Sequence, residues 1–484
     1  MRYRPTSMDV VPGRARIPRV PVPGLVIGVV VLEVVLILGF GLYAALLSVL
    51  VPGALWLSKR PQRGILVLAA LLPFNGLLII AGLPGIVKGW KEALVIFLLF
   101  LTFIVPDATR RSDRKLPPWM PALGALLVVA FLSGLTEDWL TAYTGLRISY
   151  FDVLIFFVIW RAPLNRKEID HLVTIFVVVG IITAAVGVWQ QTVGYAYLNS
   201  LGYSYNETIR FASGLRLRSF STFNQPFPFA FYLMLVILLA TPFALAEPRR
   251  LRNRIFFISL PLLAAGLVFS YVRGAMLGLG IGLLYLAFHR YKLLVAGIPL
   301  ILVALLFLPS GTSFTNALFQ RHTLTARTTG WKDHVDTVIR HPLGVGIGKT
   351  GAAGAKVASL ENPQSNNNPY QPDNSYVKVG LELGLIGLWL MLLMLVTMVL
   401  YTRSVERRTT GVDSHFATAV TAQLLAIIAA SWVATYFEML PMDQFFWLMA
   451  GIVATLAPAV KASSAPMSSR QPLALLQRRV PTRT

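Results

Sequence analysis

The sequence contains no cysteine and only six histidines among its 484 residues. Without cysteine the chain has no disulfide, no thiolate metal site and no cysteine nucleophile. Six scattered histidines argue against a metal centre. Charged residues are also scarce at 13%, whereas hydrophobic residues make up 56% and the mean hydropathy is +0.67. A soluble domain cannot cover so much apolar surface, so the composition predicts an integral membrane protein.

Apolar runs of about twenty residues recur along nearly the whole chain, and in hydrocarbon such runs must be helical because a helix satisfies its own backbone groups. They predict an all-α polytopic membrane protein with about 14 transmembrane helices, in a range of roughly 12 to 14. The expected spans are residues 24–39, 40–57, 64–83, 88–106, 119–137, 141–160, 170–192, 227–246, 255–271, 274–289, 293–309, 376–402, 415–436 and 444–460.

The formal net charge of +22 would suggest nucleic-acid binding in a soluble protein. Here most of the excess Lys and Arg lies in short loops between apolar runs, as the positive-inside rule requires, so we expect no nucleic-acid partner. We expect basic cytoplasmic tails at 1–23 and 461–484, the second disordered, and a transmembrane domain at 24–460. The basic segments that then face the cytoplasm are 110–115, 161–167, 249–254, 289–292 and 403–408.

This topology leaves two longer segments on the extracytoplasmic side, at about 194–226 and 310–375. Functional residues concentrate in such loops when a rigid scaffold holds them. The second and larger loop contains an expected amphipathic helix at 323–340. The residues spaced to share one face of this helix are Arg327, Trp331, Val335 and Val338.

A glycine-rich turn follows at 344–348. Together with Lys349 and Thr350 it resembles a phosphate-binding loop, but Leu343 stands where that motif requires glycine. We therefore interpret it as a tight turn that lets the backbone approach a ligand closely. A flexible stretch rich in Asn, Pro and Gln is expected from Leu360 to Gln371.

Arginine on the extracytoplasmic side conflicts with the orientation rule, so each such residue needs another reason. The residues concerned are Arg210, Arg216, Arg218 and Arg273. Arg273 stands between two apolar runs with almost no loop, which places its guanidinium at the membrane boundary. Converging arginines suit a pyrophosphate because a guanidinium pairs bidentately with phosphate oxygens and keeps its charge. The alternatives are snorkelling to the interface and pairing with Asp or Glu.

Other charged residues lie in or beside apolar spans, where they usually face a cavity or a partner. Weaker site candidates of this kind are Arg147, Asp152, Glu382 and Glu438. We assign no role to Glu33, Lys88, Lys91 and Glu92, which we interpret as helix ends or local pairs.

Four stretches, in their order and spacing, resemble the O-antigen ligase and O-antigen polymerase superfamily of bacterial membrane glycosyltransferases. They are Arg218–Pro226, Ser270–Ala275, Arg327–Gly348 and Asp373–Gly387. The resemblance spans most of the chain. It implies a GT-C-like helical fold and a donor glycan carried on undecaprenyl pyrophosphate. It also implies no cofactor and no metal, because polyprenyl pyrophosphate is already a good leaving group.

The resemblance also implies roles for single residues. Arg218 and Arg273 would bind the pyrophosphate, with Arg216 as the alternative to Arg218, and Arg273 would also stabilise the charge that develops on the leaving group. Asp373 would be the catalytic base, although an Asp there also suits a helix N-cap. Ligases of the family commonly have histidine at this position. Residues expected in the acceptor or donor cleft are Arg327, Trp331, Asn374 and Tyr376.

The expected function is therefore that of a polymerase in the bacterial inner membrane. It would join undecaprenyl-pyrophosphate-linked repeat units into an exopolysaccharide, capsule or O-antigen by inverting transfer on the outer face. The missing histidine favours this over a ligase that passes the finished glycan to another acceptor. A lipid-linked oligosaccharide flippase is the alternative from another class, although transporters often show repeated halves. Expected partners are the lipid-linked glycan, membrane lipids, and a chain-length regulator or flippase of the same pathway.

Overall fold

The computed structural model describes residues 51–82, 85–105, 115–201, 211–212, 216–292, 294–295, 334–361 and 373–456. The chain divides into two compact units, residues 1–60 and 61–484. In the first unit, residues 51–58 are helical. All the elements named below belong to the second unit.

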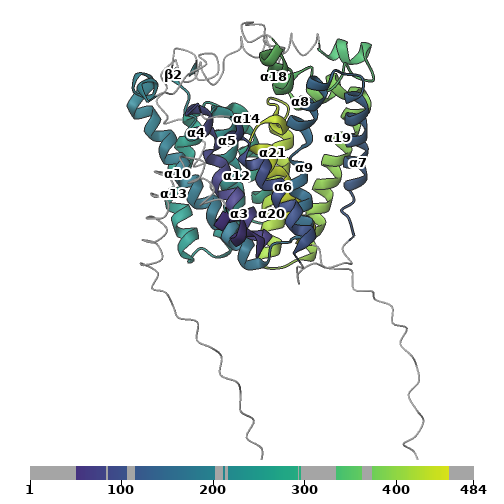
Figure 1. Ribbon diagram of the computed structural model, residues 1–484. Helices are drawn as coiled ribbons and strands as arrows, with labels where there is room; N and C mark the ends of the chain where they lie inside the picture. The colour runs from purple at the N-terminus through teal and green to yellow at the C-terminus, as the bar shows by residue number, and fades with distance from the viewer. Residues whose placement is uncertain are drawn as a thin grey trace, which may run out of the picture. The chain divides into compact units, whose positions relative to one another are not determined.

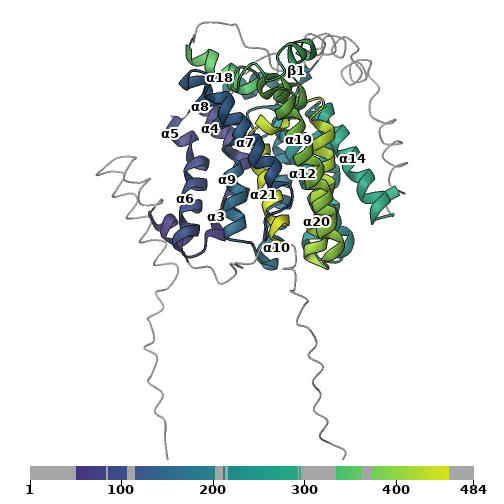
Figure 2. The same ribbon diagram turned by 90° about the vertical axis from the view of Figure 1, so that its right-hand side faces the viewer.

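The second unit is a helical bundle with one small hairpin (Figures 1 and 2). Its described α-helices are α3 (Pro61–Leu71), α4 (Asn75–Ile80), α5 (Gly85–Lys88), α6 (Trp90–Ile104), α7 (Met120–Gly134), α8 (Trp139–Tyr150), α9 (Val153–Arg161), α10 (Arg166–Ser200), α12 (Pro226–Ala246), α13 (Leu251–Phe269), α14 (Arg273–His289), α18 (Gly351–Glu361), α19 (Ser375–Arg408), α20 (Val412–Ala430) and α21 (Met442–Leu456). The shorter elements are η1 (Leu72–Phe74), η2 (Tyr436–Glu438), β1 (Phe211–Ala212) and β2 (Arg216–Leu217). The two strands pair antiparallel, with Phe211 opposite Leu217.

Six spans among the described residues are long and apolar enough to cross a membrane, and there are seven if the bent pair α8–α9 counts as one. This confirms a helical, polytopic membrane protein. The predicted spans 24–39 and 293–309 and most of 40–57 lie outside the described residues or are described only in part. The total of about 14 spans therefore stays a prediction.

Several predicted boundaries were wrong. The expected span 141–160 is broken, and its halves α8 and α9 are bent by 49°. At the break, the buried Asp152 side chain accepts a hydrogen bond from Gln444 Nε2 of α21 at 2.9 Å. This hydrogen bond replaces contact with water for a polar group inside the bundle. Helix α10 runs past the expected end at 192, with a kink at Gly194, so the expected loop at 194–226 begins as helix. Helix α18 lies within the expected loop 310–375 and includes Leu360 and Glu361, the first two residues of the stretch that was expected to be flexible.

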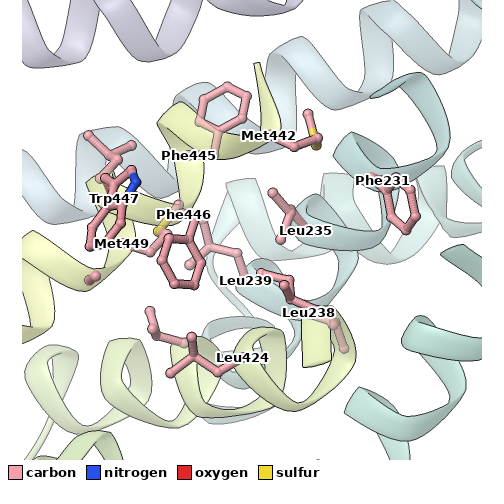
Figure 3. Close-up of a cluster of buried hydrophobic side chains, with 14 of the residues drawn as sticks. Phe231, Leu235, Leu238, Leu239, Leu424, Met442, Phe445, Phe446, Trp447 and Met449 are labelled. Atoms are coloured by element: carbon pink, nitrogen blue, oxygen red, sulfur yellow. The ribbon is translucent and has the colours of Figure 1, made fainter. Parts of the chain in front are cut away.

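Helix α12 forms the centre of the bundle because it is apolar on all sides and nearly all of its residues are buried. It packs against α10, α13, α14 and α20. Figure 3 shows Leu235 and Leu239 of α12 beside Phe446 of α21. Glycines on its neighbours allow close approach: a Cβ at Gly187 of α10 would meet the ring of Phe229 at 2.5 Å. Tight packing around α12 gives the loops at the helix ends a rigid base.

Candidate functional site

The segment from Arg218 to Gln225 is irregular, and a buried polar network fixes its path. Gln190 of α10 accepts from the backbone N–H groups of Phe220 and Ser221 at 3.0 and 2.8 Å and donates to the Ser221 carbonyl at 3.0 Å. The Ser219 hydroxyl donates to the Gly187 carbonyl at 2.6 Å. Because these groups are fully buried and paired, the serines of this stretch hold the arginine-bearing loop onto α10.

This loop in turn contacts the second arginine stretch. Arg218 Nε donates to the Ser270 carbonyl at 3.1 Å, and the Ser219 N–H donates to the Phe269 carbonyl at 2.9 Å. Arg273 follows as the first residue of α14. A cation is disfavoured by the dipole at a helix N-terminus, so Arg273 is not placed there to stabilise α14. The structure thus brings the Arg218 and Arg273 stretches together.

Both stretches contain strained backbone. Among the described residues, the non-glycine residues with positive φ are Ser221, at 54°, and Tyr271, at 55°. Such conformations cost roughly 1–3 kcal/mol and persist where the surrounding structure imposes them, often at functional sites. The strain therefore marks the same two loops that carry the unusual arginines.

The turn after α20 links these loops to the start of α19. A Cβ at Gly274 would meet Val433 at 2.9 Å, so the first turn of α14 lies against this turn. The Ser375 N–H donates to the Ser431 carbonyl at 2.9 Å, and the Ser375 hydroxyl donates to the Ala434 carbonyl at 2.9 Å. The stretches of Arg218, Arg273 and Asp373 are thus connected through residues 431–435.

Asn374, not Asp373, caps α19. Its side chain accepts from the backbone N–H groups of Tyr376 and Val377 at 2.9 and 3.1 Å, and it is 1% exposed. Tyr376 is buried too, and its hydroxyl donates to the Ile428 carbonyl at 2.8 Å. Asp373 is partly buried next to the cap. The side chains of Asn374 and Tyr376 therefore hold α19 in place.

Replacing Asn374 by alanine is expected to destabilise the protein by about 0.5–2 kcal/mol, because the first N–H groups of α19 lose their acceptor. Asn374→Asp is expected to keep most of this stability, since a carboxylate also caps a helix. The measurement is the thermal unfolding of both variants in detergent. Equal stability of wild type and Asn374→Ala would show that the cap does not matter.

The glycine turn packs into a break in α19. Gly344, Gly346 and Gly348 have φ of 92°, 112° and 85°, which favour glycine, and Gly384 within α19 has φ 66°. The Leu385 N–H donates to the Pro342 carbonyl at 3.0 Å across the break. The turn's own N–H groups bind protein acceptors, as Gly348 does with Glu382 Oε1 at 3.1 Å. The close approach expected there is therefore to α19 rather than to a ligand.

A buried ion cluster, Lys378 with Glu382 and Glu438, lies behind this turn. Lys378 Nζ is 2.8 Å from Glu382 Oε2 and forms a second ion pair with Glu438 Oε1, and all three side chains are at most 5% exposed. Glu382 Oε1 also accepts from the Thr350 N–H and hydroxyl, and Glu438 Oε2 accepts from the Ala352 N–H at 3.2 Å. The cluster joins the glycine turn, α18, α19 and η2.

A cavity of about 640 Å³ lies beside the cluster. It is bounded by η1 and α4, the α8–α9 break, the Phe223–Gln225 segment, α18 and residues 435–443. Its polar lining comprises Asn75, Lys91, Glu92, Arg147, Asp152, Asn224, Gln225, Lys356, Ser359, Thr435, Glu438 and Asp443. It shares Asn224 and Gln225 with the Arg218 loop. At the other end of α8, Asp138 caps the helix, and the Thr141 N–H, donating at 3.0 Å, holds the pKa of that carboxyl below its usual value.

Other expected site residues are placed only in part. Arg216 pairs as a strand residue in the short hairpin. Arg210, Arg327 and Trp331 lie outside the described residues. Residues 334–340 of the expected amphipathic helix are helical, but Val338 is buried whereas Val335 is 47% exposed. The weaker candidates Arg147, Asp152, Glu382 and Glu438 all lie at the cavity or in the ion cluster.

Sequence reasoning missed Lys378 and gave Lys91 and Glu92 no role. Glu92 Oε1 pairs with Lys91 and with Arg147 of α8, each at 2.9 Å, at the cavity wall. A signal for Lys378 was present, since it stands four residues before Glu382, a spacing that pairs opposite charges on a helix.

Fold and site define a polytopic membrane protein whose arginine-bearing loops and polar cavity adjoin the turn after α20. A family model described as O-antigen ligase matches residues 256–392, from α13 into α19, and this match supports the resemblance to the O-antigen ligase and polymerase superfamily. Comparison with curated proteins gave no match. The matched segment includes Arg273 and Asp373, and Arg218 lies outside it. The family supports an activity of the O-antigen ligase or polymerase type, that of a membrane glycosyltransferase.

Proposed function

We propose that the protein polymerises undecaprenyl-pyrophosphate-linked oligosaccharide repeat units into a surface polysaccharide on the outer face of the bacterial inner membrane. Both termini are cytoplasmic in this proposal, in agreement with the distribution of Lys and Arg. A transmembrane domain at 24–460 carries the chemistry between two basic tails. No cofactor takes part.

The observation that carries the proposal is the connection of three loops that are far apart in sequence. Arg218 contacts Ser270, the start of α14 lies against residues 431–435, and Ser375 binds the same turn. This connection supports a single site in which Arg218 and Arg273 hold an anionic leaving group near Asp373.

In the proposed reaction, an acceptor hydroxyl oxygen attacks the anomeric carbon of the donor sugar. The bond from that carbon to the phosphate oxygen breaks, and polyprenyl pyrophosphate leaves with the electron pair. Asp373 takes the hydroxyl proton, while the guanidinium groups of Arg218 and Arg273 stabilise the charge that develops on the pyrophosphate. Attack from the face opposite the leaving group inverts the anomeric centre.

Asp373→Asn is expected to lower the transfer rate by roughly 10²–10⁴, because the amide cannot accept the proton. Asp373→His is expected to restore much of the rate, since an imidazole also serves as a base. The measurement is single-turnover transfer with each variant, alongside its thermal stability. A fully active Asp373→Asn protein would reduce Asp373 to a structural role.

The test of the function uses purified protein in proteoliposomes with a lipid-pyrophosphate oligosaccharide and no nucleotide or divalent metal. A ladder of longer lipid-linked chains, resolved by gel or mass spectrometry, is expected for a polymerase. Transfer of an intact glycan to a different added acceptor lipid would instead favour a ligase, the activity in the description of the matching family. Movement of unchanged substrate across the bilayer would overturn both in favour of a transporter.

A further inference from the structure

The cavity of about 640 Å³ has a chemistry different from that of the arginine loops. Its volume falls within the ~300–1,000 Å³ typical of small-molecule sites. Neither Arg218 nor Arg273 lines it, although Asn224 and Gln225 at the end of the Arg218 loop do. Thr435 ends the turn that also borders α14 and α19, and it lines the cavity as well. The cavity therefore adjoins the proposed pyrophosphate site without being part of it.

Of the charged residues on the cavity wall, Lys91, Glu92, Arg147 and Glu438 form ion pairs within the wall or just behind it, whereas Lys356 is an exposed cation on α18. Lys91 and Arg147 both pair with Glu92 at 2.9 Å. Glu438 pairs with Lys378 of the ion cluster. A phosphate or pyrophosphate would have to compete with these carboxylates for the cations, which makes the cavity poorly suited to a strong anion.

Two further carboxyl groups, those of Asp152 and Asp443, line the cavity. The Gln444 N–H fixes Asp443 by donating to its Oδ1 at 2.8 Å. Gln444 Nε2 fixes Asp152 by donating at 2.9 Å. With the amides of Asn224 and Gln225, the wall presents both donors and acceptors without a large net charge.

We propose that this cavity binds sugar hydroxyls of the lipid-linked glycan. Hydroxyl groups both donate and accept hydrogen bonds, which matches a wall of carboxyl and amide groups. The apolar lining, including Phe151 and Phe223, offers surface for the C–H faces of a sugar ring. The inference rests on the proposed function, since it assigns the sugar residues next to a pyrophosphate held by the arginines.

The experiment measures binding of a free oligosaccharide that carries no lipid and no pyrophosphate. The probe is the repeat-unit oligosaccharide released by mild acid from the lipid pool of the source cells, titrated calorimetrically into the full chain in detergent. Ser359→Trp adds a bulky side chain at the cavity lining from an exposed position on α18. We expect it to weaken binding about tenfold or more. Its matched control is Leu360→Trp on the same helix, which does not alter the lining and is expected to bind as wild type does.

Asp152→Asn tests the hydrogen-bonding wall without filling the space. It is expected to weaken oligosaccharide binding about tenfold, because the amide replaces one carboxyl acceptor by an N–H donor. Asp413→Asn, at the start of α20 outside the cavity lining, is the control for an Asp-to-Asn change in the bundle. Undiminished binding in both Ser359→Trp and Asp152→Asn, or no binding to wild type, would overturn the proposal.

The hydroxyls can belong to the donor or to the acceptor, and kinetics separates the two. If Ser359→Trp raises only the KM for the labelled acceptor, measured with the donor saturating, the cavity binds the acceptor. If it raises only the KM for the donor, measured with the acceptor saturating, the cavity binds the donor. Oligosaccharide binding without any transfer would overturn the proposed function and leave the cavity site standing. Normal transfer together with normal oligosaccharide binding by both cavity variants would overturn the cavity site and leave the proposed function standing.

Discussion

Replacing Lys378 by methionine is expected to destabilise the protein by about 3–5 kcal/mol, because it leaves Glu382 and Glu438 buried without their cation. Burying a charge is tolerable only when an opposite charge and hydrogen bonds replace the lost water. Methionine fills much of the space but supplies neither. The measurement is the fraction of protein that stays monodisperse in detergent after heating.

Two further variants separate this cause from a simple packing defect. Adding Glu382→Gln and Glu438→Gln to Lys378→Met removes both uncompensated charges and is expected to recover most of the lost stability. Arg166→Met breaks an ion pair with Asp413 whose arginine is 73% exposed, and it is expected to cost less than about 1 kcal/mol. If Lys378→Met is no worse than Arg166→Met, the ion cluster does not hold the loops together.

The consequences of this cluster reach beyond stability. Glu382 binds the glycine turn and Glu438 binds the first residues of α18, while Lys378 connects the two carboxylates. Loss of the cation is therefore expected to loosen α18 over the cavity as well as the turn in α19. The cluster gives the polar face of the bundle a fixed arrangement that apolar packing of helices does not supply.

Hydropathy predicted most of the described spans because lipid leaves a long apolar run only one backbone solution, the helix. It could not predict the bend between α8 and α9, because the run 141–160 is apolar enough to read as one span, and the contact of Asp152 with Gln444 at the break involves a distant helix. Nor could it predict that α10 continues past Gly194, since the residues beyond are less apolar. The hydropathy of a segment reports only on that segment, whereas the bend and the helix extension also involve residues elsewhere in the chain.

Arginines that conflict with the orientation rule were a sequence signal for loops that contact each other in the structure. This signal singled out Arg218 and Arg273, which the structure places in contacting loops. It could not show that Asn374 rather than Asp373 caps α19, because both residue types suit a cap and only the backbone geometry distinguishes them. The cavity could not be predicted from the sequence because its wall is formed by segments that are far apart in the chain.

Arg273→Ala is expected to lower the rate of glycan transfer by about 10²–10³ or more, since a neutral side chain cannot stabilise the charge on the departing pyrophosphate. The protein is expected to stay folded in the membrane, because a cation at the N-terminus of α14 contributes little to the stability of that helix. Arg273→Lys keeps the charge but loses the bidentate fork, so an intermediate rate is expected.

The measurement for Arg273 is the single-turnover rate with a lipid-pyrophosphate donor, together with the binding of that donor. Arg254→Ala, an exposed arginine near the start of α13, is the control and is expected to transfer at the wild-type rate. If Arg273 acts in the transition state, its loss lowers the rate more than it weakens donor binding. Polymer made at the normal rate by Arg273→Ala would remove this arginine from the site, and the leaving group would need another cation.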